Sequence, residues 1–499
     1  MTTRSLLSAL PASLSPLRIT GNGRATREPI HTLCADSRLA GACSLFIAIR
    51  GARSDGHDYL PAAYAQGCRC FLVEKPPEHP LPSDADVYLV PDTRRAQAHL
   101  AAAYYAYPQK KLRLIGITGT KGKTTTALLC YQLLRDMGES VAYIGTDGVR
   151  YGNIAEPTRN TTPDSLELHR LFRSMVDNGV RTVIMEISSQ SVRQHRIEGL
   201  SFTVGAFTNL SPDHISPTEH PDFEDYRDCK RAFLHDHITK GGTLLLNADD
   251  LHAAYMAKGS LAHIRTYGIH TSADLRAERL TPTRCNGIPA TLFFCDRQEV
   301  LLSMPGEYNV SNALCAIEIL RTLGYSHLDI LPRLSAVAVP GRLEPLPAPE
   351  GCAVLVDYAH NGVSLRAVLT TLRDYTDGRL ICLVGSVGGR TQLRRADLGD
   401  AAAALADLTV LTADNPDFED PADICREMAH VFTERGQDNY LILPDRADAI
   451  RRALTLMRRG DILLLAGKGT ENYQLIRGEK RPFSEREIVA EALRDALLV

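Results

Sequence analysis

The sequence lacks a long apolar run, a large net charge and an export signal. No stretch reaches the ~18 uninterrupted apolar residues that a membrane-spanning helix needs. The net charge is −3, so no overall positive field points to a nucleic-acid partner. Residues 1–17 are interrupted by Pro11 and Pro16 and have no apolar core followed by a cleavage site. We therefore expect no signal peptide, no membrane span and no nucleic-acid partner, and we place the protein in the cytoplasm.

The sequence also lacks paired cysteines with a spacing typical of zinc sites. Its 12 cysteines are scattered, and without an export signal we expect free thiols. Cys68 and Cys70 are too close together for a usual zinc pair, and no partner pair follows. What remains is an ordinary globular composition, 44% hydrophobic and 23% charged, in a chain of 499 residues. That length predicts about three domains.

The most informative segment is a glycine-rich turn between a strand and a helix. Residues 112–117 form an apolar run typical of a buried strand, and residues 127–134 repeat apolar residues at helical spacing. Between them, Gly119 and Gly122 allow backbone N–H groups to turn toward phosphate oxygens, next to the positive end of the helix dipole. Lys123 can reach the terminal phosphates of a nucleotide, and the Thr124 hydroxyl is placed to bind magnesium. The turn predicts ATP binding by Gly119, Thr120, Lys121, Gly122, Lys123, Thr124 and Thr125.

Strands and helices alternate along the chain and predict an α/β fold in three domains. Residues 1–107 read as a small N-terminal α/β domain. Residues 108–339 read as a central domain with a mostly parallel, P-loop ATPase-like sheet, because strands recur between helical patterns. Residues 340–499 read as a C-terminal Rossmann-like, doubly wound domain.

Polar side chains follow two further strands of the central domain. Glu186 lies at the end of a buried apolar strand, where a second magnesium ligand is expected beside a phosphate loop. His214 lies in a segment after another strand, and Lys230 lies in a helical run shortly after it. A bare lysine ammonium has no acceptor and cannot ligate a cation, so chemistry alone predicts that Lys230 is a solvated helix residue.

The motifs together resemble the Mur ligases of peptidoglycan synthesis, over nearly the whole chain. The matching segments are Gly-Thr-Lys-Gly-Lys-Thr-Thr (119–125), Glu-Ile-Ser-Ser (186–189), Asn-Leu-Ser-Pro-Asp-His (209–214), Tyr-x-x-Cys-Lys (226–230), Pro-Gly-Glu-Tyr-Asn-Val-Ser-Asn (305–312), Gly-Arg-Leu-Glu (341–344), Asp-Tyr-Ala-His (357–360) and Gly-Lys-Gly (467–469). Asp-Ser-Arg (36–38) and Asp-Gly-His (55–57) make the sequence most similar to the MurE branch, which adds the third, diamino acid residue of the stem peptide.

The resemblance implies roles for further residues. Lys230 matches a carbamylated lysine. The carbamate is an anion and would join Thr124, Glu186 and His214 in holding Mg²⁺. The resemblance implies that the catalytic residues are Lys123, Lys230, His214 and Glu186. Asn309, Arg342 and Asp357 match positions that hold ATP. Contacts to UDP-N-acetylmuramoyl-L-alanyl-D-glutamate are implied for Ser37, Asn160, Thr161, Thr162, Ser188, Gln194 and Arg196. Gln190 stands where many relatives have histidine, so it is left out of the site.

The implied reaction makes an amide from a carboxylate. The D-glutamate γ-carboxylate attacks the γ-phosphate of ATP, giving an acyl phosphate and ADP, and the α-amine of a diamino acid then expels phosphate. Positioning, charge stabilisation and exclusion of water by a closing C-terminal domain are the contributions expected of the protein. The resemblance thus implies ATP and Mg²⁺ as cofactors and a diamino acid as the second substrate of a monomeric enzyme.

The identity of the diamino acid depends on the segment from Asp414 to Asp417. Relatives that add meso-diaminopimelate have Asp-Asn-Pro-Arg there, and the arginine pairs with the distal carboxylate of the substrate. Asp417 would repel that group and suits a distal ammonium, as in L-lysine or L-ornithine. Arg390 and Glu471 resemble the diaminopimelate type, whereas the Asp-Tyr-Ala-His-Asn-Gly run (357–362) resembles the lysine type. We favour L-lysine, and expect Arg390, Asp414, Asn415, Asp417, Gly467 and Glu471 to bind it.

Other functions remain open alternatives. The ligase that adds D-alanyl-D-alanine and folylpolyglutamate synthase are disfavoured by the N-terminal domain and the Asp-Asn-Pro motif. A phosphate-loop switch or motor would hydrolyse nucleotide without an amino acid and has no role for Lys230. A non-catalytic UDP-sugar binding module is disfavoured by the intact Lys123 and Thr124.

Overall fold

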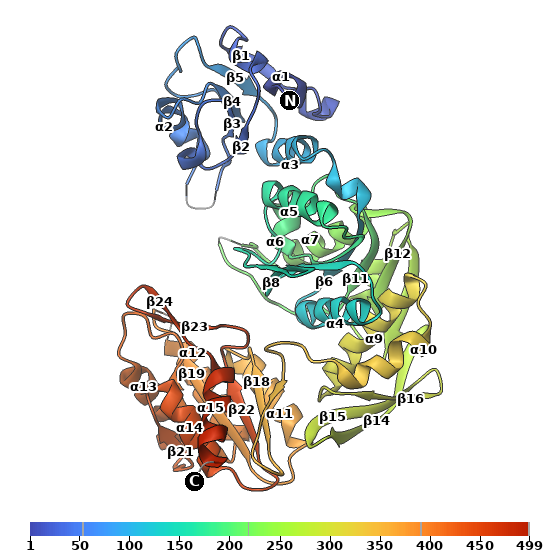
Figure 1. The fold of residues 1–499 in the computed structure, drawn as a ribbon, viewed down its shortest axis with the longest axis vertical. Coiled ribbons are helices and arrows are strands. Elements are labelled where there is room, and N and C mark those ends of the chain that lie inside the picture. Colours follow the sequence, from blue (N-terminus) through green and yellow to red (C-terminus); the bar gives the residue numbers. More distant parts are fainter. Residues whose placement is uncertain (52–53, 218, 390–391, 498–499) are drawn as a thin grey trace. The chain divides into compact units, whose positions relative to one another are not determined.

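The α/β fold class is confirmed by a computed structural model that describes residues 1–51, 54–217, 219–389 and 392–497 (Figure 1). The chain packs into two compact units: residues 1–274 with 318–324, and residues 275–317 with 325–499. Within the described residues, no helix is long and apolar enough to cross a membrane. The predicted division at residues 107 and 339 stays a prediction.

The N-terminal part of the first unit is a small sheet covered by helices. Its strands are β1 (Leu17–Thr20), β2 (Thr32–Cys34), β3 (Ser44–Ile47), β4 (Cys70–Val73) and β5 (Asp86–Leu89), and its helices are α1 (Thr3–Leu7), α2 (Leu60–Ala65) and α3 (Thr93–Tyr104). The order is β1-β5-β4-β3-β2, with β2 to β5 parallel and β1 antiparallel to β5. β3 and β4 are buried on both faces, as expected for parallel strands between two layers of helices.

The rest of the first unit is built on a larger, mostly parallel sheet. Its strands are β6 (Arg113–Thr118), β7 (Val141–Gly145), β8 (Gly148–Tyr151), β9 (Ile154–Glu156), β10 (Thr182–Glu186), β11 (Phe202–Phe207), β12 (Ile238–Asn247) and β13 (His263–Gly268). Its helices are α4 (Lys123–Asp136), α5 (Ser165–Asp177), α6 (Ser189–Arg193), α7 (Phe223–Asp236) and α8 (Ala253–Ala257). The strands run in the order β13-β12-β11-β6-β10-β7-β8-β9, and only β8 and β9 are antiparallel to their neighbours.

The register of this sheet positions the predicted phosphate site. β6 lies between β10 and β11, and Glu186, the last residue of β10, pairs with Ile117 of β6. The carboxyl ends of β6, β10 and β11 therefore meet at one edge of the sheet. Ligands of open parallel sheets bind at such an edge.

The second unit combines an antiparallel sheet with a doubly wound one. The antiparallel strands are β14 (Leu275–Cys285), β15 (Ile288–Cys295) and β16 (Gln298–Leu302), which the sequence analysis did not predict. The helix α9 (Glu307–Thr322), whose residues from 318 onward belong to the first unit, and α10 (His327–Ile330) follow. Then come β17 (Glu344–Leu346), β18 (Ala353–Asp357), α11 (Gly362–Arg373), β19 (Leu380–Ser386), α12 (Gln392–Leu405), β20 (Leu408–Ala413), α13 (Pro421–Glu434), β21 (Tyr440–Ile442), α14 (Arg446–Leu456), β22 (Ile462–Ala466), β23 (Tyr473–Ile476), β24 (Glu479–Pro482) and α15 (Glu485–Leu497).

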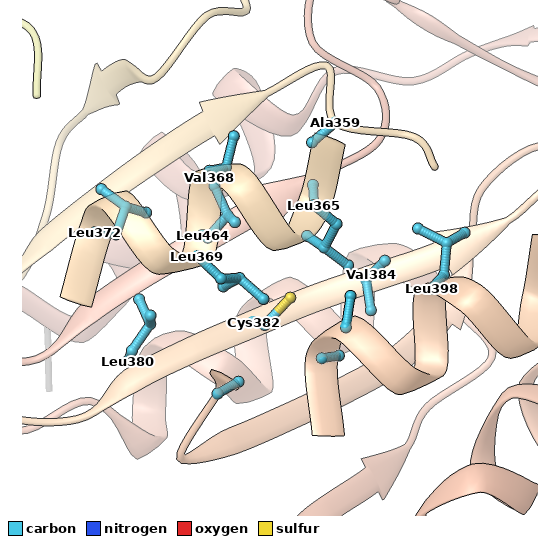
Figure 2. Close-up of a cluster of buried hydrophobic side chains, with 14 of the residues drawn as sticks. Ala359, Leu365, Val368, Leu369, Leu372, Leu380, Cys382, Val384, Leu398 and Leu464 are labelled. Atoms are coloured by element: carbon cyan, nitrogen blue, oxygen red, sulfur yellow. The ribbon is translucent and has the colours of Figure 1, made fainter. Parts of the chain in front are cut away.

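The doubly wound sheet has the order β17-β18-β22-β19-β20-β21 and is parallel except for β17. One face packs on α11, whose Leu365, Leu369 and Leu372 repeat at helical spacing and are fully buried (Figure 2). They belong to one apolar cluster with Cys382 of β19 and Leu464 of β22. Burying each leucine contributes roughly 2 kcal/mol, so this core fixes the strands whose ends carry the predicted acceptor residues.

Candidate functional site

The phosphate loop lies between β6 and α4, as predicted. Gly119 has a φ of 147° and Gly122 a φ of 84°, and a Cβ at Gly119 would lie 1.9 Å from the Thr208 hydroxyl. Glycine is therefore required at Gly119, both by conformation and by space. α4 begins at Lys123, so the loop leads directly into a helix N-terminus, the site where phosphate binds best.

The loop backbone is hydrogen-bonded to Asn209, from the segment after β11. The N–H groups of Thr120 and Lys121 donate to the carbonyl and side-chain oxygens of Asn209, at 2.8 and 2.9 Å. The Lys123 ammonium folds back over the loop and donates to the carbonyls of Gly119 and Thr120, at 2.9 and 3.0 Å. These contacts place the lysine across the loop that would hold the phosphates.

Glu186 meets the phosphate loop at Thr124. Its carboxylate is fully buried and accepts hydrogen bonds from the hydroxyls of Thr124 (2.9 Å), Tyr143 (2.7 Å) and Thr146 (3.2 Å), and from the Thr146 N–H (2.9 Å). The predicted pair of oxygen ligands is thus brought together, and hydroxyl and carboxylate oxygens fit the hard ligand set that Mg²⁺ prefers. Tyr143 and Thr146, which orient the carboxylate, were not predicted.

Lys230 is buried, so the chemical expectation of a solvated lysine is wrong. Only 1% of the residue is exposed, and its amine donates to the Gly119 carbonyl at 2.8 Å and lies 4.4 Å above the Tyr226 ring. Burial, together with the positive charge of Lys123, lowers the pKa of Lys230 well below its usual value. A neutral amine can attack CO₂, whereas an ammonium cannot. The environment therefore fits the carbamate that the sequence resemblance implies.

His214 lies beside Tyr226, the ring that the Lys230 amine also contacts. Its ring centre is 6.0 Å from that of Tyr226, it has a φ of 57°, and its Nδ1 is 3.3 Å from the Glu219 carboxylate. The Tyr226 hydroxyl lies 3.1 Å from that of Thr120 in the phosphate loop. Tyr226 thus connects the loop to the predicted ligands Lys230 and His214. The sequence motif contained this tyrosine, but nothing in it indicated that role.

His220 is a further residue that sequence reasoning missed. It is fully buried, with Nδ1 2.6 Å from the Asp225 carboxylate and Nε2 2.8 Å from the Ser189 hydroxyl. His220, Asp225 and Cys229 also present possible metal-ligand atoms within 4.8 Å of one another. Burial and the Asp225 charge raise the pKa of the Cys229 thiol to about 11. The distances describe a hydrogen-bonded chain from Asp225 through His220 to Ser189.

The predicted contacts to the muramoyl substrate gather around Thr162. Its hydroxyl donates to the Glu186 carbonyl at 2.8 Å and accepts from the Ser188 N–H at 3.1 Å. Arg196 donates to the Thr162 carbonyl and to the Gln194 side chain, both at 2.8 Å, and burial lowers its pKa. Four of the seven predicted residues therefore form one connected group beside Glu186.

The remaining three predicted contacts are Thr161, Asn160 and Ser37. Thr161 is linked to Thr146 through their hydroxyls, at 3.1 Å. Asn160 lines a cavity of about 600 Å³ together with Asp36 and Leu39, which flank Ser37. Ser37 itself begins a short 3-10 helix, Ser37–Leu39, capped by Asp36. The cavity is within the first unit and is large enough for a nucleotide-sized ligand.

The three predicted ATP contacts beyond the loop lie in the second unit. Asp357 ends β18, and its carboxylate accepts from the N–H groups of Leu343 (2.9 Å) and Ala359 (2.8 Å), while burial raises its pKa. Arg342 stacks on Tyr358 at 4.9 Å. Asn309 is buried on α9 and donates to the Pro305 carbonyl at 2.8 Å.

The predicted acceptor residues form a network at the ends of β20 and β22. Lys468 is fully buried, and its ammonium contacts Asp414 (3.3 Å), Asn415 (3.1 Å) and Glu471 (3.3 Å). Gly467 has a φ of 112°, and a Cβ there would lie 3.3 Å from the Asp414 carboxylate. Four predicted residues are thus brought together by a lysine to which the sequence analysis gave no role.

Asp417 is half-buried, and both its backbone and its carboxylate form hydrogen bonds to residues 475–478. It has a φ of 53°, its N–H and carbonyl bond to Leu475 and Arg477, and its carboxylate accepts from the Gly478 N–H at 2.7 Å. The loop is therefore attached to the hairpin of β23 and β24. Arg390, the remaining predicted acceptor residue, lies outside the described residues.

The phosphate loop lies beside the oriented carboxylate of Glu186, and the α/β fold has a doubly wound second sheet. These features define an ATP-dependent enzyme of the phosphate-loop class. Three family descriptions match the chain: Mur ligase family catalytic domain (29–105), Mur ligase middle domain (117–320) and Mur ligase glutamate ligase domain (341–469). The chain belongs to the Mur ligase family, the ATP-dependent ligases of peptidoglycan synthesis.

Individual relatives extend over nearly the whole chain. The UDP-N-acetylmuramoyl-L-alanyl-D-glutamate–2,6-diaminopimelate ligase of Chlorobaculum tepidum is 40% identical over 497 residues, covering 96% of both chains. The enzyme of the same name from Bacteroides thetaiotaomicron is 35% identical over 489 residues, 97% of this chain and 99% of its own. A solved structure of a ligase with this name matches with a TM-score of 0.69 at 26% identity, covering 95% and 96%.

Proposed function

We propose that this chain joins L-lysine to the D-glutamate γ-carboxylate of UDP-N-acetylmuramoyl-L-alanyl-D-glutamate at the expense of ATP. The observation that carries the proposal is the buried, deprotonation-prone Lys230 amine against the phosphate loop. A phosphate loop that only hydrolysed nucleotide would gain nothing from a desolvated lysine at this place. The similarity to ligases acting on this UDP-linked substrate supports the first substrate, and meso-diaminopimelate and L-ornithine are the alternative acceptors.

The residues of the phosphate loop would hold the phosphoryl donor. The Lys123 ammonium, with those backbone N–H groups of the loop that do not bond to Asn209, would neutralise the phosphates and the charge that develops on the transferred group. Mg²⁺, held by Thr124, Glu186, His214 and the Lys230 carbamate, would supply further positive charge at the phosphate oxygens. Thr162, Ser188 and Arg196 would orient the acceptor carboxylate beside the loop.

Lys230 would reach its active form by reaction with CO₂. The neutral amine attacks the carbon of CO₂, a new N–C bond forms, and one amine proton leaves to solvent, giving an anionic carbamate. The carbamate oxygens can accept hydrogen bonds or ligate a cation, which the ammonium cannot do. Lowering the pKa of Lys230 by burial and by the neighbouring Lys123 thus prepares the residue for modification.

The preference for L-lysine rests on Asp417. A carboxylate at this place attracts a distal ammonium and repels the distal carboxylate of diaminopimelate. The same carboxylate accepts from the Gly478 N–H, so a useful test must separate its charge from its hydrogen bond. Asp417→Asn keeps an oxygen acceptor for that N–H and removes only the charge.

The test compares kcat/KM for L-lysine, L-ornithine and meso-diaminopimelate in the wild type, Asp417→Asn and Asp417→Arg. The wild type should prefer L-lysine. The Asn variant should lose roughly tenfold of that preference, corresponding to about 1.4 kcal/mol, and the Arg variant should favour meso-diaminopimelate. A preference for meso-diaminopimelate in the wild type, or the same preference in all three proteins, would remove Asp417 from acceptor selection.

The proposal places the protein in the cytoplasm, because ATP and the nucleotide-linked precursor are cytoplasmic compounds. It also includes a monomeric state. Size-exclusion chromatography with light scattering would check the monomer. A mass near 54.7 kDa is expected, and twice that mass would contradict it.

A further inference from the structure

We infer that His220 is a positioning residue that couples the substrate-binding helix α6 to the helix α7 that carries Lys230. The inference rests on the proposed function, since it uses the roles proposed for Ser188, Lys230 and His214. His220 is fully buried. Its two ring nitrogens bond to the two helices, and its backbone bonds to the loop of His214.

The first contact is to α6. The Ser189 hydroxyl lies 2.8 Å from Nε2 of His220, and Ser189 is only 4% exposed. α6 is short, and its N-cap is Ser188, whose hydroxyl accepts from the Ser191 N–H at 3.2 Å. The position of Ser188, a proposed contact of the muramoyl dipeptide, is therefore determined by the start of α6, where His220 is attached.

The second contact is to α7. Nδ1 of His220 lies 2.6 Å from the Asp225 carboxylate, which can only accept, so Nδ1 donates to Asp225, while Nε2 is paired with the Ser189 hydroxyl. Asp225 lies in the first turn of α7 and is fixed by the N-cap Asp222, which accepts from its N–H at 2.8 Å. Lys230 follows on the same helix. The imidazole thus joins two helix starts through one rigid ring.

The third contact is through the backbone. The His220 N–H donates to the His214 carbonyl at 3.2 Å, so the loop that carries His214 closes on the same residue. The His220 ring also packs edge-on against Tyr226 at 5.3 Å, and Tyr226 bonds to the phosphate loop. Arg193, at the end of α6, adds a second link to Asp225 at 2.9 Å, but this pair is partly exposed and therefore weaker.

The two nitrogens can be tested separately. Asparagine at position 220 places its amide near Nδ1 and can keep the Asp225 contact, but it is too short to reach Ser189. Glutamine places its amide near Nε2 and can keep the Ser189 contact, but loses the bond to Asp225. His237→Asn is a matched control, because His237 is a partly buried histidine at the end of α7 that bonds to the Leu200 carbonyl at 3.2 Å, away from the site.

Two binding measurements, made without turnover, give the readouts. Calorimetry with UDP-N-acetylmuramoyl-L-alanyl-D-glutamate should show about tenfold weaker binding to His220→Asn, with the control within twofold of wild type. Titration of Mg²⁺ in the presence of a fluorescent ATP analogue should show a several-fold higher half-saturating concentration for His220→Gln only. Ser189→Ala should add nothing to His220→Asn, since both remove the same contact.

The outcomes separate the inference from the proposed function. Failure of the wild type to bind the UDP-linked dipeptide would overturn the proposed function, and the inference with it. Normal wild-type binding, with both His220 variants within twofold of it in both measurements, would overturn the inference alone. Equal losses in His220→Asn, His220→Gln and His237→Asn would do the same, because they would show a general effect on folding.

Discussion

The proposed neutral state of Lys230 makes a prediction about stability that needs no substrate. Replacing Lys230 by methionine keeps a long flexible side chain and removes the buried amine. The amine makes one hydrogen bond, to the Gly119 carbonyl, and is otherwise desolvated above Tyr226. We expect Lys230→Met to be inactive in ligation, and yet more stable than the wild type at neutral pH in CO₂-free buffer.

The size of that difference should depend on pH in one direction. The pKa of Lys230 is lowered in the folded protein, so between that value and its ordinary value of 10.5 the unfolded chain binds one more proton than the folded chain. Wild-type stability therefore rises with pH in this window by up to about 1.4 kcal/mol per pH unit, and the methionine variant lacks this term. The advantage of the variant should shrink as pH rises and stay constant below the lowered pKa.

Differential scanning calorimetry at several pH values between 7 and 10 would measure this. At about 2–4 °C per kcal/mol for a domain of this size class, the difference in Tm should change by roughly 3–6 °C per pH unit. Lys240→Met, which removes an exposed lysine from β12, is the control and should differ from the wild type equally at each pH. A Tm difference for Lys230→Met that does not change with pH would mean that Lys230 is charged when folded, and would refute the account of the carbamate.

Two further substitutions test the phosphate site. Glu186→Gln should abolish ligation and lower stability by roughly 1–3 kcal/mol, because the hydrogen bonds that a buried carboxylate now accepts would be replaced by weaker bonds to a neutral amide. Thermal unfolding without ligands checks the effect on stability, and an unchanged Tm would contradict it. Gly119→Ala should weaken ATP binding by more than tenfold, since its Cβ would lie 1.9 Å from the Thr208 hydroxyl. Equilibrium binding of a fluorescent ATP analogue measures this change. An affinity equal to that of the wild type would contradict the prediction and show that the loop can relax around the added methyl group.

The local motifs of the fold were predictable because they are encoded in short segments. The glycines, the following Lys123 and the flanking apolar runs specify strand, loop and helix within about twenty residues, and β6 and α4 confirm them. The end of β10 at Glu186 was predictable for the same reason. The antiparallel strands β14 to β16 were missed because strand pairing depends on long-range partners, which a local apolar pattern does not identify.

The candidate site was predictable in its residue types and less so in its contacts. Lys230 looks like a surface residue in its helix, and only the packing of α7 against the phosphate loop buries it. His220 and Tyr226 act through side chains that approach from different elements, so spacing along the chain does not reveal them. Asp417 was predicted as a substrate contact, whereas its bond to Gly478 depends on a hairpin some sixty residues later.

The central claim is that this chain uses ATP to ligate a diamino acid to a UDP-linked muramoyl dipeptide. The most direct measurement incubates the purified protein with ATP, Mg²⁺, UDP-N-acetylmuramoyl-L-alanyl-D-glutamate and, separately, L-lysine, L-ornithine or meso-diaminopimelate, and follows product mass and phosphate release. The account predicts a UDP-linked tripeptide, formed fastest with L-lysine, and phosphate release that requires both substrates. Comparable phosphate release with ATP alone, and no tripeptide with any of the three amino acids, would contradict it.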